Sequence, residues 1–283
     1  MRKLAIAALS FSVAVFAANY ILTIKLCPVL AALFLLAGGA LLVMRRKWLR
    51  GMVICFFSLA AGLGCFGIHY LTTTVPAHRL AGETVQVNAV VLNYPRQYEG
   101  FSSAEIRLMQ EGLPRLRTVL YDRTGSLDGL VPGAGISGEL KFSSADTRYG
   151  EGYDYYNAQD IYLVANTTEE LQTLPVSGID ISCLAARLNG FLTGIVDDIF
   201  PADTAPFMKS LMFGDKADLY KEEALSLAMK HSGIMHIVAV SGLHVAFLVG
   251  LIQLLMGIGP RSSLLCIALV WCFVFVTGAP PSA

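Results

Sequence analysis

The chain has no net charge, because 21 Lys and Arg residues balance 21 Asp and Glu residues. A global positive field, which many nucleic-acid-binding proteins use, is therefore excluded. The chain has six cysteines. None of the six lies in the polar stretch 72–181, which excludes a disulfide framework there. No C-x-x-C spacing occurs, so the most common zinc and redox motifs are missing.

Apolar residues are abundant, since 55% of the 283 residues are hydrophobic. Three apolar runs come first, at 4–24, 26–44 and 51–71. Each is close to the roughly 20 residues that cross a bilayer as a helix. The first is interpreted as an uncleaved anchor, because the run continues beyond a weak signal-peptide cleavage candidate. The composition predicts a polytopic α-helical membrane protein, with three transmembrane helices over residues 1–71.

Basic residues predict the orientation of these spans. Arg2 and Lys3 precede the first run, and a basic cluster over 45–50 separates the second run from the third. Under the positive-inside rule, the N-terminus and the 45–50 loop are cytoplasmic, so the third span delivers residue 72 to the outside. The sequence thus predicts a multi-pass protein whose next region is extracellular.

Between residues 72 and 174 the composition changes to that of a soluble β domain. Turn-forming residues separate five candidate strands, at 84–92, 102–108, 116–122, 135–142 and 161–166. Five short strands are typical of a small closed barrel, and an OB-fold is the leading candidate. The expected fold class is therefore a polytopic α-helical membrane protein with an inserted extracellular all-β OB-like barrel.

Helical patterns return after the β domain. Apolar residues recur every three or four positions over 181–199, which predicts an amphipathic helix. Two shorter helices are expected at 207–213 and 222–230. Because these helices are too polar to span, residues 175–233 are assigned to the membrane surface. Two further spans are expected at 234–258 and 264–276, and the chain then stops like a truncated polypeptide.

The segment 231–245, HSGIMHIVAVSGLHV, places imidazoles and a Ser-Gly pair at the start of the fourth apolar run. Such polar groups are costly in hydrocarbon, so they usually face a pore, a cavity or a partner helix. The candidates for lining a channel are His236, Ser241, Gly242 and His244, with a break expected at the Ser-Gly pair. The alternative is that the histidines lie at the water interface and satisfy backbone groups.

The aromatic-rich region 72–174 is a candidate nucleic-acid binder, because aromatic rings stack on single-stranded bases without reading their sequence. Its charge argues against strong phosphate binding, since thirteen acidic side chains outnumber eight basic ones. One local cluster of basic residues stands out against this acidic excess. The candidates for DNA contact are therefore Arg115, Arg117 and Arg123, with Tyr121 between them. The alternative is a barrel that caps the membrane part and packs its tyrosines on neighbouring elements.

Ser241 and His244 also raise an intramembrane serine hydrolase as an alternative. The residue two before the serine is Ala239 rather than the glycine of a Gly-x-Ser motif. A base three residues along the same helix aligns poorly with the serine oxygen. Three histidines on one broken helix are also a poor geometry for a metal site. We therefore assign no catalytic residue, metal or cofactor, and do not expect an enzyme.

The stretch 233–245, GIMHIVAVSGLHV, closely resembles a segment of the ComEC family of competence proteins. The resemblance extends to three further stretches, GEGYDYY at 150–156, LMFGDK at 211–216 and TGAPPS at 277–282. It implies a channel that imports single-stranded DNA across the bacterial inner membrane during natural transformation. The implied partners are single-stranded DNA, the lipid bilayer and other competence proteins, and a homo-oligomer is a further expectation.

Parts of the family pattern are missing from this sequence. Residues 234–283 correspond to the start of the family's membrane domain, with two spans, and its remaining helices do not follow. The metallo-β-lactamase-like domain that many members carry is also missing, and no H-x-H-x-D-H motif occurs. A family nuclease activity is therefore not expected here. An inactive, truncated fragment of the channel stays open as a further alternative.

Overall fold

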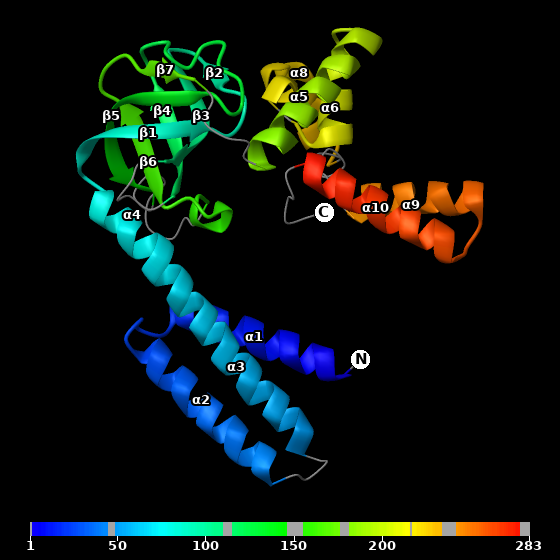
Figure 1. Cartoon of the computed structure of the whole chain (residues 1–283). Coiled ribbons are helices and arrows are strands. Elements are labelled where there is room, and N and C mark those ends of the chain that lie inside the picture. Colours follow the sequence, from blue (N-terminus) through cyan, green and yellow to red (C-terminus); the bar gives the residue numbers. More distant parts are fainter. Residues whose placement is uncertain are drawn as a thin grey trace. The chain divides into compact units, whose positions relative to one another are not determined.

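The computed structural model describes residues 2–44, 49–109, 115–145, 155–175, 181–215, 217–233 and 242–277 (Figure 1). The chain divides into two compact units. The first comprises Met1–Ala81 and Ser144–Leu163, and the second comprises Gly82–Ser143 and Val164–Ala283. Three long helices dominate the first unit, whereas the second contains most of a β-barrel and the helices that follow it.

The first unit is built on α1 (Arg2–Tyr20), α2 (Leu26–Val43) and α3 (Arg50–His69). The segments Lys3–Tyr20, Leu26–Val43 and Arg50–Leu80 are long and apolar enough to cross a membrane. The prediction of three long apolar helices at the N-terminal end is therefore confirmed. Their placement in a membrane, and its orientation, stay predictions.

The third helix does not end at Leu71, where its apolar run ends. It continues through a π-helical turn, η2 (Tyr70–Thr74), into α4 (Val75–Leu80). The physical reason is Pro76, which lacks an amide hydrogen and whose ring crowds the carbonyl one turn earlier. A π-helical turn widens the helix and accommodates that crowding without ending it.

Small residues allow α1 and α3 to pack closely. Ala14, Ala18 and Leu63 are buried between the helices of this unit. A Cβ atom built on Gly62 would lie 2.8 Å from the carbonyl oxygen of Phe11 and 2.9 Å from the Cβ atom of Ala14. The approach of the two backbones therefore depends on the absence of a side chain at residue 62.

We expect Gly62→Ala to destabilise the protein by about 1–2 kcal/mol, because the added methyl group would meet backbone that cannot move aside. Thermal unfolding of the purified chain in detergent measures the effect. Gly64→Ala on the same helix is the control, since a Cβ atom there has no neighbour within 4 Å. Equal unfolding midpoints for the two variants would contradict the close contact.

The barrel is formed by five principal strands and two short ones. The strands are β1 (Thr84–Val91), β2 (Arg96–Tyr98), β3 (Phe101–Leu108), β4 (Arg117–Asp122), β5 (Gly135–Ser144), β6 (Leu163–Thr167) and β7 (Gln172–Leu174). The sheet follows the order β1-β3-β4-β6-β5, and pairing of β5 with β1 closes it. The short strand β2 pairs with β3, and β7 pairs with β5.

The barrel is mixed. Antiparallel pairs join β1 to β3, β3 to β4, and β1 to β5. The Ala145 amide donates to the Tyr162 carbonyl, and the Thr168 amide donates to the Glu139 carbonyl, so β5 and β6 are also antiparallel. It follows that β4 and β6 run parallel. The prediction of a five-stranded barrel is confirmed, whereas its position outside the cell stays a prediction.

Strict alternation along β3 and β4 separates the core from the outer face. Every second residue of both strands is buried and the others are partly exposed. Ile106 and Leu120 point inward with Leu140 and Phe142, and none of the four is more than 1% exposed. The alternate residues of β3 and β4 point outward and form the outer face of these two strands.

The second unit also contains six helices in its described residues. They are α5 (Ile181–Ile199), α6 (Ala205–Phe213), α7 (Ala217–Lys221), α8 (Glu223–His231), α9 (Gly242–Met256) and α10 (Pro260–Val276). The helix predicted at 181–199 is confirmed as α5. The Arg187 Nε atom donates to the Pro132 carbonyl at 2.7 Å, which ties α5 to the barrel. Asn189 donates to the Val276 carbonyl at 3.0 Å, which ties α5 to α10.

Candidate nucleic-acid interface

The outer face of β2, β3 and β4 gathers aromatic and basic side chains. The strand register places Tyr98 opposite Phe101, and it places Ser103 between Arg96 on one side and Tyr121 on the other. Directly paired residues in an antiparallel sheet point to the same side. Three consecutive strands therefore contribute to one surface.

Three rings on this face form an aromatic row, Tyr98–Phe101–Tyr121. The Tyr98 and Phe101 rings are stacked, with centroids 4.8 Å apart and planes inclined by 12°. The Tyr121 ring lies 5.7 Å from Phe101 and is tilted by 47°. Tyr98, at the end of the row, is 51% exposed, so ring surface is open to a ligand.

The cations on this face are not equivalent. Arg117 forms an ion pair with Glu105, and both side chains are only partly exposed. Arg96, Arg115 and Arg123 are exposed, and no ion pair joins any of them to another of the residues that the structure describes. Arg96, Arg115 and Arg123 are therefore available to a phosphate, whereas Glu105 balances the charge of Arg117.

The DNA-contact candidates from the sequence all belong to this region. Arg117 and Tyr121 lie within β4, Arg115 precedes the strand and Arg123 follows it. The structure brings Tyr121 next to Phe101 and pairs Arg117 with Glu105. Contact with DNA stays a prediction for all four.

The sequence marked the region 72–174 as rich in aromatic residues but did not predict that Tyr98 and Phe101 pair. The turn at Glu99-Gly100 is the sequence signal that could have predicted this pairing. Gly100 has a φ of 81°, a left-handed conformation that glycine adopts readily. A two-residue turn of this kind sets Tyr98 directly opposite Phe101. The short strand β2 was likewise missed, because a proline-containing turn precedes it.

A buried carboxylate fixes the loop beside this face. Asp122, at the end of β4, is fully buried. It accepts hydrogen bonds from the Thr124 amide and hydroxyl, the Leu127 amide and the Thr167 hydroxyl, at 2.6–3.0 Å. Burial alone would raise the pKa of Asp122, but these hydrogen bonds together hold the pKa below its usual value. The charged carboxylate therefore anchors the loop that begins with Arg123.

The second candidate site, the histidine and serine segment, is only partly described. His236 and Ser241 lie outside the described residues. Gly242 is the first residue of α9, and His244 lies half-buried in the first turn of that helix. A pore-lining role for these four residues stays a prediction. Among the residues that the structure describes, no cluster of three His, Cys, Asp or Glu side chains could hold a metal ion.

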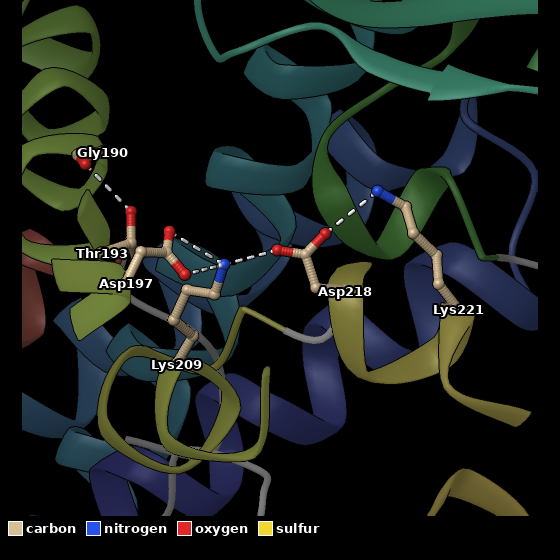
Figure 2. A network of polar contacts seen from close by, with 6 residues as sticks. All are labelled: Gly190, Thr193, Asp197, Lys209, Asp218 and Lys221. Carbon is tan, nitrogen blue, oxygen red and sulfur yellow. Dashed lines mark hydrogen bonds and ion pairs between the residues drawn. The ribbon is translucent and has the colours of Figure 1, made fainter. Parts of the chain in front are cut away.

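A charged network joins α5, α6 and α7 (Figure 2). Lys209 of α6 is 8% exposed and contacts Asp197 of α5 at 2.9 Å and Asp218 of α7 at 2.6 Å. Lys221 contacts Asp218 at 3.0 Å. Burial alone would lower the pKa of Lys209, but the hydrogen bonds and charges of Asp218 and Asp197 raise it. The charged side chain of Lys209 therefore links α6 to α5 and α7.

The comparisons with known proteins match parts of the chain. Residues 211–283 match the model of the competence protein family. This match contains α7 to α10, so the chain carries a competence-protein domain of the ComEC type. The resemblance noted in the sequence is thereby confirmed for residues 211–283.

One similar protein is ComE operon protein 3 of Bacillus subtilis (strain 168), which is 29% identical over 99 residues. The aligned part is 34% of this chain and 12% of that protein, so the chain matches only a small part of its relative. No solved structure matches the chain.

Proposed function

We propose that this chain forms part of a channel that imports single-stranded DNA across the bacterial inner membrane during natural transformation. The observation that carries the proposal is the match of residues 211–283 to the competence protein family. The three long apolar helices support a place in the membrane. In this proposal the N-terminus is cytoplasmic and the barrel lies outside, where it receives DNA.

The barrel supports a role in binding DNA. Its five principal strands, counted in chain order, follow the order 1-2-3-5-4-1, which is the order of an OB-fold. OB-folds bind oligonucleotides on the face of their second and third strands. In this chain those strands are β3 and β4, which carry Phe101 and Tyr121. We therefore propose an OB-like barrel whose aromatic face meets the incoming strand.

The channel proposal predicts that His244→Gln lowers the transformation frequency of cells that carry the full-length protein. Glutamine keeps hydrogen bonding but cannot become protonated in a pore. Uptake of labelled DNA, with the amount of protein checked by immunoblot, measures the effect. His78→Gln in α4 is the matched control. Normal uptake for His244→Gln and His236→Gln together would favour a structural role for these histidines.

An intramembrane serine hydrolase is the alternative function for the segment 231–245. It predicts that the purified protein cleaves a membrane substrate and that Ser241→Ala abolishes this cleavage. Such a result would contradict the channel proposal, whereas the channel proposal expects no cleavage by either protein.

A further inference from the structure

We infer that the barrel binds single-stranded DNA chiefly by stacking unpaired bases on the aromatic row Tyr98–Phe101–Tyr121, and that Glu105 keeps Arg117 from contributing to phosphate binding. This inference deepens the proposed function and rests on it. It names the recognition chemistry of the same face, and it differs from the expectation that an arginine cluster on β4 makes the main contact.

The geometry of the row suits base stacking. One face of the Tyr98 ring packs on Phe101, and more than half of the residue remains accessible. A base that stacks on Tyr98 would extend an existing stack of two rings. Stacking of this kind is independent of base identity, because every base has a π-face. The row therefore suits a strand of any sequence.

The charges around the row favour a single strand over a duplex. Bases within a duplex are already stacked and paired, so a duplex can be held only through its phosphates. The region 72–174 has more acidic than basic side chains. The exposed cations on β2 or next to β4 are Arg96, Arg115 and Arg123, and the partly exposed Arg107 of β3 lies directly opposite Arg117. Only an unpaired strand can use both the rings and these exposed cations.

Glu105 determines how Arg117 behaves. The two side chains point outward from neighbouring strands, and their ion pair is partly shielded, with side-chain exposures of 26% for Glu105 and 37% for Arg117. A phosphate that approached Arg117 would have to displace a carboxylate and then lie beside it. The pair therefore keeps phosphate binding weak, as suits a protein that must pass the strand on.

The test is fluorescence anisotropy with the full chain in detergent, using a short labelled oligothymidylate and a duplex of equal length over a series of salt concentrations. Tyr98→Ala and Phe101→Leu are each expected to weaken binding of the single strand by about five- to 150-fold, which is the loss of one stacked base. Tyr155→Ala removes an exposed tyrosine that is not on β2, β3 or β4, and it should bind as the unaltered chain does.

The same assay tests the role of Glu105. Glu105→Gln frees Arg117, so the affinity should rise and the slope of log affinity against log salt should steepen by about 0.7. Arg117→Ala should change the affinity less than either aromatic substitution does.

Two results would overturn the inference. Unaltered affinity in both aromatic variants, with the full chain still binding the oligonucleotide, would show that the strand binds elsewhere and would leave the channel proposal standing. A full chain that binds no single-stranded oligonucleotide would overturn the inference and, with it, the proposed receiving role of the barrel. The transformation assay with His244→Gln tests the channel separately.

Discussion

Asp122→Ala is expected to reduce the local free energy of unfolding of the barrel by about 3 kcal/mol or more, because a fully buried acceptor of four hydrogen bonds is lost. The Leu127 amide, which donates to the carboxylate at 3.0 Å, would remain buried without an acceptor. The link from this loop to β6 through Thr167 would also be lost. The loop that begins with Arg123 would then lose its fixed position beside the aromatic row.

Hydrogen exchange of the full chain, followed by mass spectrometry, measures this effect in the peptides that contain β4, β6 and the loop. The matched control is Asp128→Ala in the same loop, where the carboxylate is exposed and accepts from Gln97. This control should change the local stability by no more than about 0.5 kcal/mol. Equal protection in the two variants would contradict a special role for Asp122.

The same carboxylate predicts a dependence on pH. Its pKa is lowered in the folded protein, whereas that of an unfolded aspartate is about 3.9. The stabilisation is therefore complete above about pH 4 and is lost as the pH falls through the folded pKa. Hydrogen exchange at a series of acid pH values should show this loss in the unaltered protein, and Asp122→Asn should remove the dependence.

Lys209→Met is the second substitution with a large expected effect, a loss of about 2 kcal/mol. The methionine fills the buried space but leaves Asp197 and Asp218 without the cation between them (Figure 2). A fully buried pair would cost more, but both carboxylates are partly exposed and water screens them. Hydrogen exchange in α5, α6 and α7 reports the loss.

Lys221→Met is the matched control for Lys209→Met. Lys221 contacts the same Asp218, but its side chain is 67% exposed, so its removal should cost no more than about 1 kcal/mol. If the two substitutions reduced protection equally, the burial of Lys209 would not be what gives the network its strength.

Sequence periodicity predicted the existence and bounds of a strand and a helix well. The alternation along residues 84–91 and the helical spacing along 181–199 each match an observed element. In β1 the barrel core imposes the period that was read from the sequence. In α5 the apolar residues that gave the period are largely exposed, with Ile181 71% and Ile199 68% exposed. The third apolar helix was predicted less well, because its continuation beyond Leu71 depends on how a π-helical turn accommodates Pro76.

The candidate site was harder to predict, because it depends on contacts between segments that are far apart in the sequence. Arg117 looked like an available cation until the register of β3 and β4 brought Glu105 beside it. Lys209 lies in an apolar helix, and its partners come from two other helices. No local pattern of residues encodes either ion pair.

Closure of the barrel also bears on aggregation. Each of the five principal strands has a neighbour on both sides, so none offers a free row of backbone donors and acceptors to another chain. The short strands β2 and β7 lie outside the closed order, and each has only three residues. A second copy of the chain that added a strand to β2 or β7 could form only a few backbone hydrogen bonds. A molecule that approaches the five principal strands therefore meets their side chains, because their backbone groups are already paired.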